Sequence, residues 1–363
     1  MDLPMSVSRQ QLLTVLDACV HPLIGRGLVA AGAVSEAEIA GDHARVRLTL
    51  GFPAAGIRDE LAAEVAQRIG AALGLDVALA IDWKITSHAV QKNLQPLPGI
   101  RNIIAVASGK GGVGKSTVAV NLALALVAEG ARVGLLDADI YGPSQPRMLG
   151  TEARPTSPDG KRMNPIIAHG LQAMSIGFLV DEDQPMIWRG PMVTQALGQL
   201  LNETAWQDLD YLVVDMPPGT GDIQLTLAQR IPVSGAVIVT TPQDIALLDA
   251  KKGLQMFRRV EVPVLGIVEN MAWHVCSNCG HREAIFGEGG GAKMAAQYGT
   301  ELLGQLPLRL SIREQADGGR PTVVAEPQSE ITQRYRDIAR RTAARLAYGV
   351  AAPAFPTIEI HDD

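Results

Sequence analysis

The sequence is poor in cysteine, in aromatic residues and in positive charge, and each shortage excludes a class of protein. Only three cysteines, Cys19, Cys276 and Cys279, occur in 363 residues, which argues against a secreted disulfide framework and fits a reducing cytoplasm. Aromatic residues make up 4 % of the chain, too few for a surface that stacks single-stranded bases. A net charge of −6 gives no support for nucleic-acid binding.

Long apolar runs are also lacking. No uninterrupted stretch reaches the roughly 18 apolar residues that a membrane-spanning helix needs. The first residues, MDLPMSVSRQQ, lack the basic and apolar regions of a secretory signal. We therefore expect a cytoplasmic protein without a membrane partner. Core-forming residues are abundant, since hydrophobic residues make up 47 % and charged residues 19 %, enough for two domains at this length.

Residues 1–86 predict a small α+β domain. Apolar residues recur at helical spacing near residues 8–18 and over residues 57–73. Residues 43–50 alternate apolar and polar side chains, as a half-buried strand does, and residues 75–81 form a second strand-like run. No phosphate loop or metal-ligand cluster is visible in this part of the sequence.

Residues 87–101 predict a linker, because two prolines and a glycine interrupt the pattern. Over residues 102–348 short apolar runs alternate with helical segments, ending in an arginine-rich helix at 328–348. The apolar runs lie at residues 103–107, 132–136, 211–214, 236–239 and 264–268. Such runs are typical of strands buried on both faces, so we predict an α/β domain whose mostly parallel sheet is covered by helices on both sides. Residues 349–363 are expected to be a loose tail.

A phosphate-binding loop follows the first strand of this α/β domain. The stretch Gly109-Lys-Gly-Gly-Val-Gly-Lys-Ser-Thr117 matches G-x-x-x-x-G-K-[ST] between a predicted strand and a predicted helix. Its glycines let backbone N–H groups surround phosphate oxygens, and the helix adds its positive amino-terminal dipole. Lys115 is expected to reach the β- and γ-phosphates of ATP, and Ser116 to bind Mg²⁺. The alternative is a glycine-rich turn without a nucleotide. The predicted nucleotide-binding residues of the loop are Gly109, Lys110, Gly111, Gly112, Val113, Gly114, Lys115, Ser116 and Thr117.

A second lysine, Lys110, follows the first glycine of the loop, and an ordinary phosphate loop does not need it. The variant G-K-G-G-V-G-K-[ST] resembles the deviant Walker A ATPases, a group that includes MinD, ParA and the nitrogenase iron protein. In that group the extra lysine reaches across a dimer interface to the partner's nucleotide. The resemblance implies a homodimer in which both Lys110 and Lys115 are catalytic. A solvated loop lysine is the alternative.

Two carboxylates end the second predicted strand of the α/β domain, in Leu135-Leu-Asp-Ala-Asp-Ile-Tyr-Gly-Pro-Ser144. Ligands bind at the carboxyl ends of strands in open α/β sheets. Asp139 is therefore a candidate catalytic residue that orients the attacking water or the Mg²⁺ shell, and Asp137 could support that shell. Two acids that only cap the next loop are the alternative.

Further downstream, Tyr211-Leu-Val-Val-Asp215 has the Walker B pattern, so Asp215 is expected to bind Mg²⁺ directly or through water. The next stretch, Met-Pro-Pro-Gly-Thr-Gly-Asp222, is suited to sensing the γ-phosphate. Asn270 follows another apolar run, and the resemblance to the deviant Walker A group implies that its amide reads adenine. By itself an Asn after a strand is more often a turn residue.

A C-x-x-C pair, Cys276 and Cys279, lies between His274 and His281. Thiolates suit a soft metal or a cluster, but a 4Fe–4S cluster takes four cysteines. A two-fold dimer that brings both pairs to its axis would supply four. The spacing leaves open a zinc site, a redox dithiol or two inert cysteines, and by itself it favours zinc.

Several stretches together resemble the Mrp (ApbC) family of iron–sulfur cluster carrier ATPases. They are residues 137–144, Trp188-Arg-Gly-Pro-Met192, and residues 215–222, 269–281 and 285–291. The resemblance spans roughly residues 102–348. It implies an ATP hydrolase that uses Mg²⁺ and binds a labile 4Fe–4S cluster through Cys276 and Cys279 of both subunits. Its implied partners are cluster donors and apo iron–sulfur proteins.

The amino-terminal part is similar, more weakly, to the small domain of iron–sulfur assembly factors that is often fused to this ATPase. Some relatives carry a cysteine in the loop after the central strand. Here that loop reads Gly51-Phe-Pro-Ala-Ala-Gly56 and has none, which argues against a thiol function. Cys19 is expected to be a small buried apolar residue.

Two competing classes share the nucleotide motifs. A positioning ATPase of the MinD or ParA type would use the C-x-x-C for structural zinc. MinD-like proteins end in a basic amphipathic membrane helix, whereas the last residues here are acidic and interrupted by proline. ParA-like proteins bind DNA through basic surface, and this chain is acidic. A nitrogenase-like reductase normally spreads its cluster cysteines along the chain.

Overall fold

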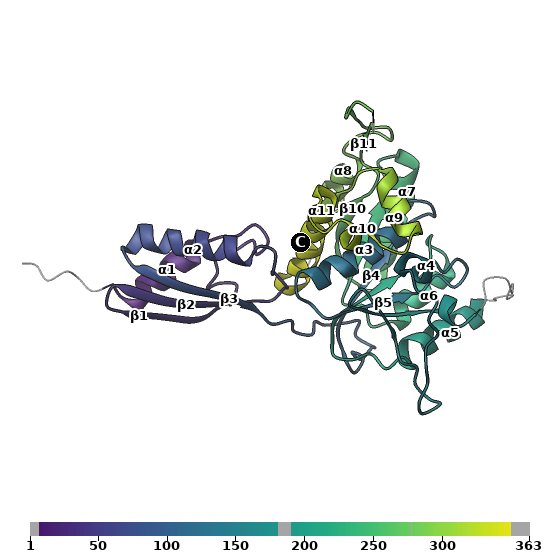
Figure 1. The fold of residues 1–363 in the computed structure, drawn as a ribbon, viewed down its shortest axis with the longest axis horizontal. Helices are drawn as coiled ribbons and strands as arrows, with labels where there is room; N and C mark the ends of the chain where they lie inside the picture. The colour runs from purple at the N-terminus through teal and green to yellow at the C-terminus, as the bar shows by residue number, and fades with distance from the viewer. Residues whose placement is uncertain (1–6, 181–189, 277, 350–363) are drawn as a thin grey trace, which may run out of the picture.

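The computed structural model describes residues 7–180, 190–276 and 278–349. Trp188 and Arg189 of the Mrp-like stretches, and the predicted tail beyond Gly349, lie outside these ranges. Two bodies of unequal size lie side by side, each built on its own sheet (Figure 1). None of the described helices is long and apolar enough to cross a membrane.

The smaller body contains a three-stranded sheet in which β1 is antiparallel and β3 parallel to the central β2. Its elements are α1 (Arg9–Ala18), β1 (Val34–Ala40), β2 (His43–Leu50), α2 (Arg58–Leu73) and β3 (Asp76–Trp83). Every second residue of β2, from Ala44 to Leu50, is buried and packs with α1 and α2, which confirms the predicted alternation. The sequence did not reveal β1, because only Ala37 of its seven residues is buried.

The larger body contains an eight-stranded sheet in the order β13-β10-β9-β4-β8-β5-β7-β6. Its strands are β4 (Ile100–Ala107), β5 (Val133–Asp137), β6 (Ile166–Ala168), β7 (Leu171–Ser175), β8 (Leu209–Asp215), β9 (Gly235–Thr240), β10 (Val264–Glu269) and β13 (Leu302–Gln305). All neighbours are parallel except β6 and β7. Every residue of β5, β8, β9 and β10 is buried, as the uniformly apolar runs predicted.

Helices cover both faces of this sheet, which confirms the predicted fold class. On one face α3 (Lys115–Ala128) packs against α11 (Glu330–Tyr348), whose first turn is capped by Ser329. A second hydrophobic cluster fills the other face. The helices on that side are α5 (Gly190–Asn202), α6 (Asp222–Arg230), α7 (Asp244–Arg259) and α8 (Gly290–Gln297). The short elements are α4 (Gln145–Leu149), η1 (Ile176–Phe178), β11 (His274–Val275), β12 (Arg282–Glu283), α9 (Leu310–Asp317) and α10 (Thr322–Ala325).

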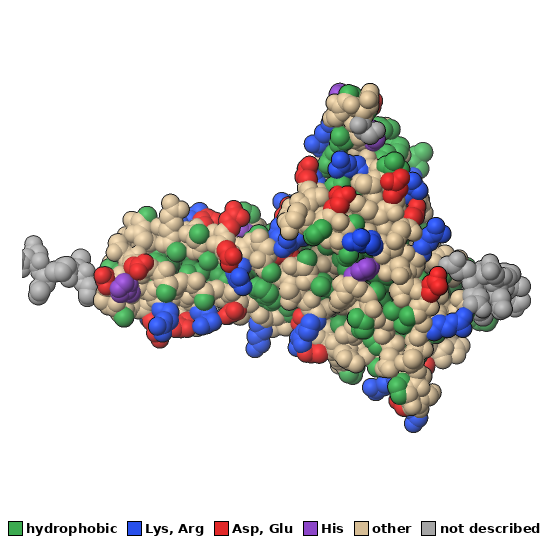
Figure 2. Space-filling model, viewed as in Figure 1, with side chains coloured by type: hydrophobic (Ala, Val, Ile, Leu, Met, Phe, Trp, Pro, Cys, Tyr) green, Lys and Arg blue, Asp and Glu red, His purple; other side chains and the backbone are tan. Residues whose placement is uncertain are grey.

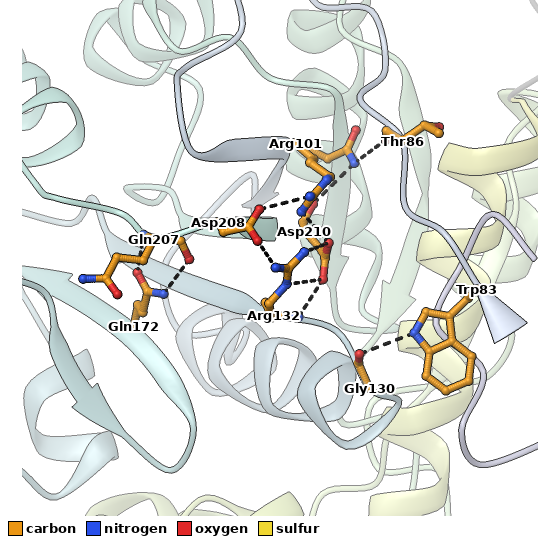
Figure 3. A network of polar contacts seen from close by, with 10 residues as sticks. Trp83, Thr86, Arg101, Gly130, Arg132, Gln172, Gln207, Asp208 and Asp210 are labelled. Atoms are coloured by element: carbon orange, nitrogen blue, oxygen red, sulfur yellow. Dashed lines mark hydrogen bonds and ion pairs between the residues drawn. The ribbon is translucent and has the colours of Figure 1, made fainter.

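An ion-pair network joins the amino-terminal ends of three neighbouring strands (Figure 3). Arg101 in β4 and Arg132 just before β5 both contact Asp208 and Asp210 at the start of β8. Arg101 Nη1 lies 2.8 Å, and Arg132 Nη2 3.1 Å, from the same carboxylate oxygen of the buried Asp210. The network fixes the sheet at the end opposite to its carboxyl-terminal loops.

The smaller body docks on the carboxyl-terminal end of α11 through residues 51–56, which we call the docking loop. The N–H of Gly51 donates to the hydroxyl of Tyr348 at 3.0 Å. The rings of Phe52 and Tyr348 meet edge to face with centroids 6.0 Å apart. One hydrophobic cluster continues from the helices of the smaller body to α3 and α11, so the two bodies share a core.

A buried carboxylate, Glu129 at the end of α3, joins the docking loop to both helices. It accepts hydrogen bonds of 2.6 Å from Arg336 and from Arg340 of α11. Its other oxygen accepts a bond of 2.9 Å from the N–H of Gly56. Buried charges are tolerated when they are paired and hydrogen-bonded in this way.

Candidate functional site

The predicted phosphate loop lies between the end of β4 and the start of α3. Gly112 and Gly114 have φ values of +81° and +79°, a left-handed conformation that costs glycine nothing. A Cβ atom on Gly109 would lie 2.1 Å from the carbonyl carbon of Asp249 in α7, and one on Gly114 would lie 2.3 Å from Nδ2 of Asn270. The fold therefore requires these glycines, and they permit the wrapped backbone that surrounds phosphate oxygens.

Three predicted residues, Lys115, Ser116 and Asp215, come together at the start of α3. The buried Lys115 ammonium bonds to one carboxylate oxygen of Asp215 and lies 3.1 Å from Ser116 Oγ. The other oxygen of Asp215 accepts a bond of 2.8 Å from Nε2 of Gln145. The candidate Mg²⁺ ligands and the phosphate-binding lysine thus form one polar cluster, in which Lys115 and Asp215 are buried.

Gln145 was missed by the sequence reasoning, although it follows directly after the acidic stretch that ends at Ser144. Its Nε2 also donates to the carbonyl of Ser116 at 3.1 Å. Its Oε1 is buried and has no partner among the described residues. An orphaned oxygen beside a carboxylate and a hydroxyl makes a hard-oxygen donor set, which is the chemistry that Mg²⁺ prefers. The residues present therefore fit a magnesium nucleotide.

Asp137 holds the loop that follows β5. One of its oxygens accepts the N–H of Asp139, and the other accepts the N–H groups of Ser144 and Gln145 and the hydroxyl of Ser175, each at 3.1 Å. The three backbone bonds fold the loop back over the end of β5, and the bond from Ser175 links Asp137 to the end of β7. This buried carboxylate therefore organises the loop, which is the capping function that the sequence left open for it.

Both acids of this loop have raised pKa values. Burial, and next the neighbouring carboxylate of Asp215, raise the pKa of Asp137 to about 7. Burial also raises the pKa of Asp139, whose oxygen accepts a long bond of 3.4 Å from the N–H of Gly142. Asp139 is partly exposed, so it is the member of the pair that solvent reaches.

Asn270 contacts the phosphate loop, and Lys110 is part of it. Asn270 is buried at the end of β10, and its Nδ2 donates to the carbonyl of Val113 at 2.9 Å. In this structure its amide supports the loop, and its contact with adenine stays a prediction. The carbonyl of Lys110 accepts a bond of 2.9 Å from Ser108 Oγ, and the function of the Lys110 side chain across a dimer also stays a prediction.

The predicted thiols lie on a hairpin formed by β11 and β12, which we call the cysteine hairpin and which projects from the top of the molecule (Figure 1). Two backbone bonds of 2.9 Å close it, from Cys276 N–H to His281 and from Gly280 N–H to Cys276. Cys276 is half-buried and Cys279 is exposed. Figure 2 shows hydrophobic surface beside this projection, over α7.

The electrostatics of the hairpin favour a thiolate. Hydrogen bonds from the backbone N–H groups of Cys279 and Asn278 lower the pKa of Cys276. His274, a possible zinc ligand, lies with Nδ1 3.2 Å from the carbonyl oxygen of Leu308. Within the described ranges no group of three or more His, Cys, Asp or Glu side chains is placed to hold a metal ion. The hairpin of one chain therefore offers two cysteine sulfurs.

Cys19 is buried in the smaller body, as predicted. Its thiol lies 3.3 Å from the carbonyl of Val15, to which it donates. Burial raises its pKa, so the thiol is protonated at neutral pH. It behaves as a small apolar residue.

Comparison with known proteins agrees with these motifs. Residues 99–343 match the family described as "ParA: NUBPL iron-transfer P-loop NTPase", and residues 9–80 match the family "Iron-sulfur cluster assembly protein". The chain is 58 % identical over 331 residues to an iron-sulfur cluster carrier protein of Escherichia coli, covering 90 % of this chain and 89 % of that protein.

More distant proteins match as well. The iron-sulfur cluster transfer protein NUBPL of Mus musculus is 52 % identical over 265 residues, covering 72 % of this chain and 83 % of that protein. A solved nucleotide-binding protein from Archaeoglobus fulgidus, in complex with ADP, is 39 % identical with a TM-score of 0.56. That match covers 64 % of this chain and 90 % of that structure. From its fold, its nucleotide motifs and these matches, the chain is a member of the ParA/NUBPL iron-transfer family of P-loop NTPases, as the Mrp-like stretches predicted.

Proposed function

We propose that this protein is a cytoplasmic, ATP-dependent iron–sulfur cluster carrier that works as a homodimer. Two copies supply Cys276 and Cys279 each, and the four thiolates hold one labile 4Fe–4S cluster as cargo. The carrier accepts the cluster from a donor and passes it to apo iron–sulfur proteins. Neither a membrane nor a nucleic acid is part of the proposal.

The observation that carries this proposal is the cysteine hairpin itself. A resident structural site is normally closed and fully ligated within its chain, whereas this hairpin offers two cysteine sulfurs, one of them exposed. The lowered pKa of Cys276 favours the thiolate that binds iron. The relatives named as cluster carriers support iron–sulfur cargo over zinc.

The nucleotide site supplies the switch. With a magnesium nucleotide bound, Lys115 would bind phosphate oxygens, and Ser116 and Asp215 would hold Mg²⁺, whose charge would neutralise that of the phosphates. Asp139 orients the attacking water, and Lys110 of each subunit reaches the nucleotide of the other. Asn270 contacts the phosphate loop and precedes Cys276 by six residues. A conformational change of the phosphate loop is therefore transmitted to the cysteine hairpin through this short segment of chain.

Anaerobic reconstitution tests the cargo. We expect about four iron atoms per dimer, the number in one 4Fe–4S cluster, with the broad visible absorbance of such a cluster. Cys276→Ala abolishes both signals, and Cys19→Ala, the matched control in the smaller body, retains them. Stoichiometric zinc that resists exchange by iron would instead favour a positioning ATPase with a structural metal.

A further inference from the structure

Two arginines stack on one tryptophan at the base of the cysteine hairpin. The guanidinium carbon of Arg282, in β12, lies 3.8 Å from the ring centroid of Trp273. That of Arg334, in α11, lies 4.8 Å from the same centroid. Both distances are within the range of a cation–π interaction, and the ring is buried. We call these three residues the Arg–Trp–Arg stack.

The stack is held from the side of α11. Glu330, one helical turn before Arg334, accepts hydrogen bonds of 3.1 Å from Nε and 2.7 Å from Nη2 of Arg334. These two hydrogen bonds fix the plane of the Arg334 guanidinium. An isolated arginine on a helix surface has no such constraint. The stack therefore joins the hairpin to a well-packed helix.

The stack also holds both strands of the hairpin. Arg282 pairs with Val275 across the hairpin, so its contact with Trp273 fixes the second strand. The first strand is held next to the stack, where the carbonyl of Trp273 accepts a bond of 2.7 Å from the N–H of Leu308. Because β11 and β12 have only two residues each, the hairpin has little stability of its own. Its position depends on these outer contacts.

Position and charge both matter for the proposed cargo. Two thiolates must meet two others in a fixed geometry, and a cluster with four thiolate ligands carries net negative charge. Nearby positive charge and hydrogen bonds tune such clusters. The stack places two guanidinium groups at the base of the element that carries the thiols: Arg334 is paired with Glu330, and Arg282 lies on the hairpin itself.

We propose that Arg282, Trp273 and Arg334 are positioning residues for the cluster, which orient the cysteine hairpin and stabilise its anionic cargo. The inference rests on the proposed carrier function and deepens it. The stack sets how long the loaded protein keeps its cluster, without touching the nucleotide.

The test compares Arg334→Gln, Arg334→Lys and Arg341→Gln in the full-length, reconstituted protein. Arg341 is the matched control, because it lies on the same helix and its ion pair among the described residues is a 3.8 Å contact with Glu301. The readout is the rate at which an excess of iron chelator removes the cluster. We expect Arg334→Gln to lose its cluster about five-fold faster, in line with one lost cation–π contact, with Arg334→Lys in between and Arg341→Gln unchanged.

A second readout needs no cargo. The part of the tryptophan emission that Trp273→Phe removes should shift to longer wavelength in Arg334→Gln, because the ring gains solvent. Arg282→Gln, at an exposed position, repeats the test if Arg334→Gln does not fold. Equal release from Arg334→Gln and Arg341→Gln overturns the inference alone. A wild-type protein that takes up no cluster overturns the proposed function, and the inference with it.

Discussion

At the scale of single residues, the candidate nucleotide site is centred on Asp215, whose carboxylate oxygens are bonded by residues that a magnesium nucleotide would also engage. Lys115 and Gln145 occupy its two oxygens, so the charge of the buried carboxylate is compensated before any ligand binds. Phosphate oxygens attract the lysine, and Mg²⁺ competes for the carboxylate. Binding a magnesium nucleotide therefore exchanges one set of charge-assisted bonds for another.

Replacing Lys115 tests the separation of the two sites. Lys115→Ala should lower ATP turnover by about 100-fold or more, since it removes a charge that stabilises the transferring phosphoryl group. The thiols lie on another element, so iron loading should remain at the wild-type level. Lys252→Ala, at an exposed position on α7, is the control. Retained turnover in Lys115→Ala would show that this loop is not the catalytic one.

Asp137 predicts a pH dependence of stability. Its pKa is raised from 3.8 to about 7 by burial and by Asp215, so the folded, nucleotide-free protein holds a proton that the unfolded chain releases near pH 4. Its contribution to the free energy of unfolding is complete below that pH and is lost as the pH rises toward 7. Urea unfolding without Mg²⁺ should show Asp137→Asn less destabilised, relative to wild type, at pH 8 than at pH 6. An equal difference at both pH values contradicts the shift.

The sequence was informative where a motif is local and silent where residues meet from distant segments. The phosphate loop and Walker B acid are local patterns, and the structure brings Lys115, Ser116 and Asp215 together. Gln145 lies outside every predicted motif, and Trp273 lies in an Mrp-like stretch that assigns it no function. Their contacts depend on how α4 and α11 pack, which neither spacing nor periodicity encodes.

At the scale of elements, two helices connect the regions of the molecule. Helix α3 begins at Lys115 and reaches Glu129 at the docking loop, and α11 carries Arg334 near the cysteine hairpin and Tyr348 at the smaller body. Both helices were predicted from the sequence, one after the phosphate loop and one as the arginine-rich segment at residues 328–348. The short strands β1, β6, β7 and β13 were not, because their few residues are incompletely buried or lie at an edge.

Glu129 tests the connection between these elements. Glu129→Gln leaves Arg336 and Arg340 without the buried negative charge that they share, so we expect a loss of about 3–5 kcal/mol in the free energy of unfolding. Glu314→Gln, which removes an exposed pair with Arg313, should cost less than about 1 kcal/mol. Urea denaturation measures both. If the two variants lose the same stability, the buried network does not hold the bodies together.

At the scale of the whole molecule, the proposed cargo requires two chains. Loading with iron should double the mass measured by sedimentation, because each chain supplies two of four ligands. The variant with both Cys276→Ala and Cys279→Ala should keep the mass of the unloaded protein under the same conditions. A loaded protein that sediments as a monomer would contradict the bridging cluster.

The projection of the cysteine hairpin has one more consequence. A cluster held on the projecting hairpin is accessible to molecules in solution. A site that a recipient protein can reach is therefore also reached by dioxygen. If the proposed function is correct, the visible absorbance of the loaded carrier should decay in air at a rate set by the exposure of the cysteine hairpin. The buried sheet beneath the hairpin should remain folded. The protein would then suit the transient transfer of a cluster rather than the storage of iron.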